Sequence, residues 1–189
     1  MSEDNTDQTA ESETAIVLDV LPHGRTEDDR PQYEKEPLAF VLDQADFSLY
    51  ELTLDEATLS IGDRFDLYDS PQVGRTTEID YDDLPRGAAS ELEYVVEDLV
   101  TEEEQRFVDF YNEAQPITLR LHQLNLLPGI GKKLRNDILD ARKRRPFESF
   151  DDIEARIDGL HSPREVLADR ILEELREDDL KYCIFAREE

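Results

Sequence analysis

Cysteine, histidine and tryptophan are scarce in this chain of 189 residues, which contains one Cys, three His and no Trp. A single cysteine, Cys183, cannot form an internal disulfide, so a fold held together by such bonds is excluded. The cysteine and the three histidines also lack the spacing of zinc ligands. We therefore expect neither a metal nor a cofactor.

Long apolar runs are absent as well. No segment approaches the about 18 consecutive apolar residues of a transmembrane helix. The N-terminal sequence, which starts Met1-Ser2-Glu3-Asp4, has neither the basic region nor the apolar run of a signal peptide. These absences predict a cytoplasmic protein that does not bind membranes.

Positive charge is also in short supply. The chain has 48 acidic residues against 21 Lys and Arg, a formal net charge of −27, and only five of its basic residues are lysines. Such a surface stays hydrated in strong salt, which favours an origin in a halophilic archaeon. An acidic adaptor from an ordinary cytosol is the alternative.

The few lysines are concentrated in one segment. Residues 120–145 hold eight basic and two acidic residues, a local charge of +6, so the rest of the chain carries −33. Three of the five lysines, Lys132, Lys133 and Lys143, lie in this segment. A basic element inside so acidic a chain predicts an anionic ligand.

The N-terminal part of the chain has the apolar pattern of strands. Residues 1–13 are acidic and aperiodic and should form a disordered tail. The Gly-Asp pair at Gly62 resembles a strand entry of small OB or S1-like barrels, so residues 14–86 are predicted to form an OB/S1-like β domain. Short apolar or alternating runs predict its strands at residues 15–21, 38–42, 47–54, 61–68 and 76–79. The second and third of these are expected to form a hairpin across residues 43–46.

From Gly87 onward the apolar period becomes that of helices, and residues 87–179 should form a helical domain. The spacing of Ser90 with Glu93, and of Thr101 with Glu104, matches capping boxes that would start the first two helices. Further helices are expected around residues 117–124 and 134–141, in a short segment before Gly159, and over residues 163–177.

The last residues, 180–189, contain an apolar run that predicts a strand. Because a lone strand needs hydrogen-bond partners, we expect it to return to the β domain. The predicted fold class is therefore α+β, in which a small OB/S1-like barrel is followed by a helical domain and closed by a C-terminal strand.

Residues 119–145 resemble a helix-hairpin-helix motif, whose turn presents backbone amides to a nucleic-acid phosphate. Gly129 and Gly131 suit positive φ angles and lack a Cβ, so a phosphate oxygen can come close, while Ile130 should point inward. Amides at a helix start are unpaired donors, and the helix dipole favours an anion there. Lys132 and Lys133 in that first turn would cost about 0.3–1 kcal/mol without a bound anion.

Residues 146–177 resemble a second, degenerate unit of the same motif. This copy has a single glycine, Gly159, in its turn, and Pro163 removes one amide. We therefore expect it to pack against the first unit rather than to bind.

The order of these parts resembles the archaeal DUF655 family. The resemblance rests on residues 17–24, 106–108, 116–122, the hairpin, 146–150 and 181–185. It implies an OB-like N-terminal part, a helix-hairpin-helix C-terminal part and RNA binding, with rRNA or the ribosome as a setting.

The predicted function is non-enzymatic nucleic-acid binding. RNA is the favoured ligand and DNA the alternative, since such a hairpin contacts the backbone rather than the bases. Two rivals stay open: a protein-interaction adaptor whose hairpin is only structural, and a processing enzyme whose site the sequence does not reveal. No catalytic or metal-binding residue is predicted; the predicted nucleic-acid-binding residues are Leu127, Pro128, Gly129, Ile130, Gly131, Lys132, Lys133, Arg135, Arg142, Lys143, Arg144 and Arg145.

Overall fold

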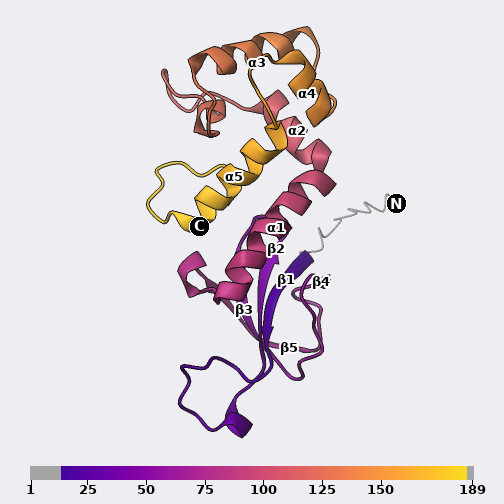
Figure 1. The fold of residues 1–189 in the computed structure, drawn as a ribbon, viewed down its shortest axis with the longest axis vertical. Helices are drawn as coiled ribbons and strands as arrows, with labels where there is room; N and C mark the ends of the chain where they lie inside the picture. Colours follow the sequence, from indigo (N-terminus) through magenta and orange to yellow (C-terminus); the bar gives the residue numbers. More distant parts are fainter. Residues whose placement is uncertain (1–13, 187–189) are drawn as a thin grey trace, which may run out of the picture.

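The structure is a computed structural model that describes residues 14–186. The tail predicted for residues 1–13 lies outside the described residues. Figure 1 shows an elongated molecule with a sheet at one end. Helices α2 (Glu104–Glu113), α3 (Lys132–Arg144) and α4 (Phe150–Arg156) lie at the other end, and α1 (Arg86–Glu102) and α5 (Pro163–Arg176) lie between them. Within residues 14–186, no helix is both long and apolar enough to cross a membrane.

Five antiparallel strands form one sheet in the order β4-β1-β2-β3-β5. The predicted hairpin between the second and third strands is present. The strands are β1 (Thr14–Leu21), β2 (Leu38–Asp43), β3 (Leu49–Leu54), β4 (Arg64–Asp66) and β5 (Val73–Ile79).

The sheet is open, so the prediction of a closed OB/S1-like barrel is wrong. Strand β4 has three residues and pairs only with the start of β1, while β5 pairs with β3 at the opposite edge. A strand this short cannot also reach β5 to close a barrel. The face of the sheet turned away from α1 covers a small apolar cluster of Ala15, Val17, Ala39, Val41, Leu52, Leu54 and Leu67.

The helices follow the predicted apolar periods, but two starting points were misplaced. Helix α1 begins at Arg86 after Pro85, so Ser90 lies inside it. Thr101 also lies inside α1, where its hydroxyl donates to the carbonyl of Glu97 at 2.9 Å. The α-helices are α1 (Arg86–Glu102), α2 (Glu104–Glu113), α3 (Lys132–Arg144), α4 (Phe150–Arg156) and α5 (Pro163–Arg176), with short 3-10 helices η1 (Gln32–Glu34), η2 (Tyr81–Asp83) and η3 (Gln123–Leu126).

The helix predicted around residues 117–124 is absent. Residues 116–122 form a tight loop closed by a bridge between Pro116 and His122, and only the four-residue η3 follows it. Because the amides of Ile117 and Thr118 both donate to the carbonyl of Leu121, the backbone has partners here that a helix would not use.

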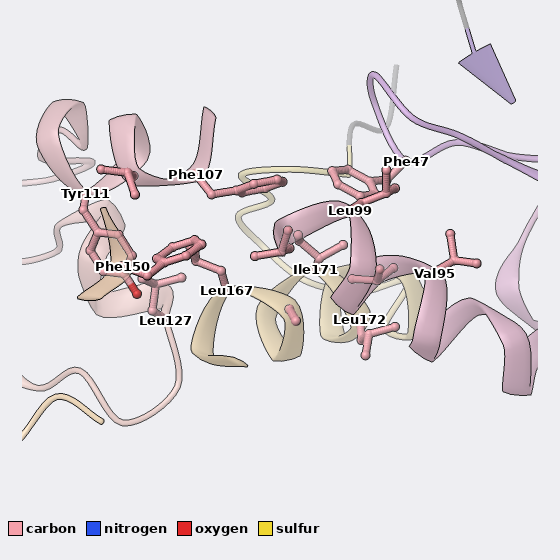
Figure 2. Close-up of a cluster of buried hydrophobic side chains, with 14 of the residues drawn as sticks. Phe47, Val95, Leu99, Phe107, Tyr111, Leu127, Phe150, Leu167, Ile171 and Leu172 are labelled. Carbon is pink, nitrogen blue, oxygen red and sulfur yellow. The ribbon is translucent and has the colours of Figure 1, made fainter. Parts of the chain in front are cut away.

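One hydrophobic core connects the sheet to the helices. It runs from Ile16 and Leu42 on the sheet, through Leu92 and Leu99 of α1, to Ile171 of α5 and the start of the hairpin region. Figure 2 shows this continuity, with side chains of α1 and α5 facing one another. The sheet and the helical part therefore share a core.

The C-terminal segment returns to this core, but it does not form the predicted strand. The Glu174 carboxylate accepts hydrogen bonds from the amides of Ile184, Phe185 and Ala186, at 2.8 to 3.0 Å. Arg170 donates to the same carboxylate at 2.9 Å, and its side chain and that of Glu174 are both buried. The Glu174 carboxylate thus accepts the backbone hydrogen bonds for which we expected a neighbouring strand.

Candidate nucleic-acid interface

The turn at residues 127–131, called the first turn here, connects η3 to α3. Its Ile130 amide donates to the Leu127 carbonyl at 3.2 Å, and both of these side chains are buried in the core. Pro128 and Gly129 face outward, and Gly129 has a φ of 79°. The expectation that Ile130 points inward is confirmed.

Gly131 differs from what we expected, because its φ of −85° is open to any residue. A Cβ placed at Gly129 or at Gly131 would meet no heavy atom within 4 Å. The two glycines therefore leave the outer face of the turn open, although only Gly129 needs a positive φ.

The amides that follow the first turn are free to bind a ligand. The first hydrogen bond of α3 runs from the Arg135 amide to the Gly131 carbonyl at 3.0 Å. Among residues 14–186, no acceptor is found for the amides of Lys132, Lys133 and Leu134. Unpaired amides at the positive end of a helix dipole are suited to an anion.

Asn125 holds the first turn in place. Its side-chain amide donates to the Ile130 carbonyl at 3.2 Å, and its oxygen accepts from Arg135 at 3.1 Å and from the His122 amide at 3.3 Å. We did not predict this residue. His122 and Asn125 have the spacing of a capping box, but they are not the Ser or Thr with Glu or Gln that marks such a box in a sequence.

His122 completes this clamp as a neutral group. Its Nδ1 accepts a hydrogen bond from the Leu124 amide at 3.1 Å, which requires that nitrogen to be unprotonated. Burial lowers the pKa of His122, and the charges of Arg142 and Arg135 lower it further. The imidazole therefore acts as a helix cap.

The predicted basic residues do not gather at one place. Lys132 and Lys133 lie at the N-terminal end of α3 with their side chains exposed. The Lys133 Nζ atom is 3.6 Å from Oδ2 of Asp137. Lys143 and Arg144 lie at the other end of the helix, about 16 Å away at 1.5 Å per residue. Of the exposed lysines and arginines in this segment, the two lysines follow the open turn directly, and Arg170 and Glu173 of α5 line the hollow beside it.

Arg142 and Arg145 of this segment have structural partners. Arg142 donates to the carbonyls of Tyr111 and Ala114 at 3.0 and 2.9 Å, which caps the end of α2, and burial lowers its pKa. Arg145 pairs with Asp152 at 3.1 Å. Basic residues in the last turn of a helix also complement its dipole. Packing therefore explains much of the cluster that we had assigned to nucleic acid.

A second turn, residues 157–162, joins α4 to α5 and repeats the geometry of the first. The Leu160 amide donates to the Ile157 carbonyl at 3.3 Å, both side chains are buried, and Gly159 has a φ of 88°. A Cβ at Gly159 would lie 3.7 Å from Leu134 of α3, so this turn packs beside the first unit. Pro163 is buried and offers no amide.

Comparisons with known proteins agree over nearly the whole chain. The model of a family described as "Protein of unknown function (DUF655)" matches residues 11–187. An uncharacterized protein of Methanocaldococcus jannaschii is 38% identical over 182 residues, which cover 92% of this chain and 79% of that protein. The crystal structure of Af1531 from Archaeoglobus fulgidus, of the same family, superposes with a TM-score of 0.83 at 37% identity, covering 93% of this chain and 99% of that one.

Proposed function

This chain belongs to the DUF655 family of proteins of unknown function, and we propose that it is a non-enzymatic nucleic-acid-binding protein, with RNA as its principal ligand. In this proposal a backbone phosphate sits against the first turn. The amides of Lys132, Lys133 and Leu134 donate to the phosphate oxygens, and the two lysine side chains flank it. The turn acts as the hairpin of a helix-hairpin-helix motif.

The placement of Lys132 and Lys133 is the observation that carries the proposal. Two cations at the positive end of a helix dipole, next to unpaired amides, are unfavourable by about 0.3–1 kcal/mol for each residue. A phosphate bound in the open turn reverses the sign of both interactions. A turn that only joined two packed helices would need the buried Ile130, but it would not need these lysines.

The charge of the remaining surface restricts how such binding works. The chain outside residues 120–145 carries −33 and repels nucleic acid at long range. In strong salt, which this acidic composition suits, the Debye length falls to about 3 Å and that repulsion is screened. Contact-range amides and two lysines would then supply the affinity.

A charge-reversal experiment tests the proposal. The variant Lys132→Glu with Lys133→Glu is compared with Arg75→Glu combined with Arg86→Glu, two exposed arginines on the sheet side of the molecule. Both variants change the net charge by the same amount. The probes are a labelled RNA duplex, a labelled single-stranded RNA and a DNA duplex of matching sequence.

We expect the lysine variant to lose about tenfold or more in affinity, equivalent to about 1.4 kcal/mol, because it removes charge-assisted contacts. The arginine variant should retain most of the affinity. Equal losses in both would mean that only net charge matters. If the probes bind neither variant nor parent, nucleic-acid binding is contradicted. The adaptor alternative, in which the acidic surface docks a basic protein, is then favoured.

A salt titration of the parent provides a second test. Each neutralised phosphate contributes a slope of about −0.7 to −0.9 to log affinity against log salt concentration. Contacts confined to the first turn should give the slope that corresponds to about two to three neutralised phosphates. A slope that requires about eight phosphates would contradict the proposal and move the binding surface to the wider basic cluster, including Lys143 and Arg144.

A further inference from the structure

Leu119 stands at the tip of the loop between α2 and η3 with its side chain entirely in solvent. Its relative exposure is 107%, the highest of the large hydrophobic residues in the described part of the chain. Leaving a leucine there forgoes the favourable free energy of burial. Arg120, beside it, is also exposed, and no ion pair joins it to another described residue.

Hydrogen bonds within the loop hold its backbone in one conformation. The Thr118 hydroxyl oxygen accepts hydrogen bonds from the amides of Arg120 and Leu121, at 3.2 and 3.0 Å. The Leu121 carbonyl in turn accepts from the amides of Ile117 and Thr118, at 2.8 and 3.0 Å. These bonds close the tip and hold Leu119 outward.

Both ends of the loop are fixed to the unit that carries the first turn. Arg142 of α3 donates to the Ala114 carbonyl, just before the loop, at 2.9 Å. After the loop, the His122 amide donates to Asn125, the residue that clamps the first turn. In Figure 1 the chain between α2 and α3 forms one edge of the upper part of the molecule. Leu119 therefore keeps a set position relative to the proposed phosphate site.

We propose that Leu119 is an apolar wedge that inserts between the bases of the nucleic acid held at the first turn, with Arg120 against a neighbouring phosphate. This inference rests on the proposed function. Leucine is among the side chains that proteins insert between base steps, and insertion would bury its exposed surface. Nucleic acid is favoured over a protein pocket because the tip lies next to Arg120 and is tied to the unit that carries Lys132 and Lys133.

The test uses the full chain and RNA and DNA duplexes that contain the fluorescent base 2-aminopurine, whose emission rises when it is unstacked. Binding of the parent should raise the emission. Leu119→Ala should bind about fivefold or more weakly and abolish the rise, because contacts with unstacked bases contribute strongly to affinity. Leu119→Met should restore both, since it keeps a long apolar side chain.

Ile61→Ala is the matched control, because Ile61 is 55% exposed and lies on the sheet side of the molecule. It should behave as the parent does. All of these changes affect exposed side chains, so the variants should fold.

The outcomes separate the wedge from the proposed function. If Leu119→Ala binds and unstacks the probe as the parent does, while the Lys132 and Lys133 reversal loses binding, the wedge is wrong and the phosphate site stands. If the parent gives no rise in emission, Leu119 does not insert. If the lysine reversal binds as tightly as the parent, the phosphate site is wrong, and the wedge that depends on it is wrong too.

Discussion

The first and second turns have the same backbone but different surroundings. In each turn, the backbone amide of one buried aliphatic residue donates a hydrogen bond to the carbonyl of another, which lies three residues earlier in the chain. Each turn also contains a glycine with a positive φ. The glycines of the first turn face open space, whereas Gly159 faces Leu134. Lysines follow the first turn, and the buried Pro163 follows the second. The difference shows that turn geometry alone does not create a binding surface.

The helices that follow the two turns also differ in how many residues they bury. Helix α3 has one fully buried residue, Ile138, whereas α5 buries seven residues and packs against α1. The carbonyl of Pro163 accepts a hydrogen bond from the buried Tyr111 hydroxyl at 2.8 Å. We therefore expect changes in the first unit to affect binding, and changes in the second unit to affect stability.

The largest effect is expected at Glu174. Glu174→Ala removes the acceptor of three amides and the buried carboxylate partner of Arg170, which should lower the free energy of unfolding by about 3–5 kcal/mol. Glu173→Ala, whose partner is also Arg170 but whose side chain is half-exposed, should cost about 1 kcal/mol or less. Urea unfolding at constant salt measures both. A small loss for Glu174→Ala would contradict the structural role of α5.

The two positive-φ glycines offer a paired comparison. Gly129→Ala and Gly159→Ala should each lower the free energy of unfolding by about 1–2 kcal/mol, because alanine is strained at these φ angles. Only Gly129→Ala should also weaken probe binding when measured well below its melting temperature. Equal binding losses in the two variants would show that both turns contact the ligand.

The contribution of His122 to stability should depend on pH. The pKa of His122 is lowered in the folded protein, so its contribution to stability is present above about pH 6.5 and is lost as the pH falls through the folded pKa. His122→Asn keeps an acceptor for the Leu124 amide without titrating. The free energy of unfolding of this variant should therefore fall less than that of the parent between pH 7 and pH 5. Unfolding curves across this range provide the measurement.

The smallest change in stability is expected at Gly131. Its φ suits any residue and its surroundings are open, so Gly131→Ala should leave the free energy of unfolding within about 0.5 kcal/mol of the parent. The added methyl group would project into the proposed phosphate site and should weaken binding. An unchanged affinity would mean that the phosphate does not bind at this end of the turn.

Most elements of the fold could be predicted because they follow from local patterns. Alternation predicted the hairpin of β2 and β3, the helical period predicted α1, α2, α3 and α5, and the glycines around Ile130 predicted a turn with that side chain inside. The degenerate second turn was also expected to pack against the first unit, and Gly159 does lie beside Leu134. These features depend on residues close together in the chain.

The errors arose where a backbone group had more than one available partner. The C-terminal apolar run has the composition of a strand, but its amides bind the carboxylate of Glu174 on α5. Residues 117–124 have a helical period, but the Leu121 carbonyl closes a loop instead. The role of Arg142 likewise depends on the end of α2, 28 residues away from it in sequence at Ala114.

The sequence by itself determined the acidic surface, the concentration of lysines after a glycine turn, and the periods that place apolar side chains on one face of each element. Only the tertiary structure decided that the sheet stays open, that the basic residues at the two ends of α3 lie apart, and that Asn125 and Glu174 hold the first turn and the C-terminal segment. The physical reason is that burial follows local periodicity, whereas the partners of buried hydrogen-bonding groups depend on which distant segments the packing brings within reach.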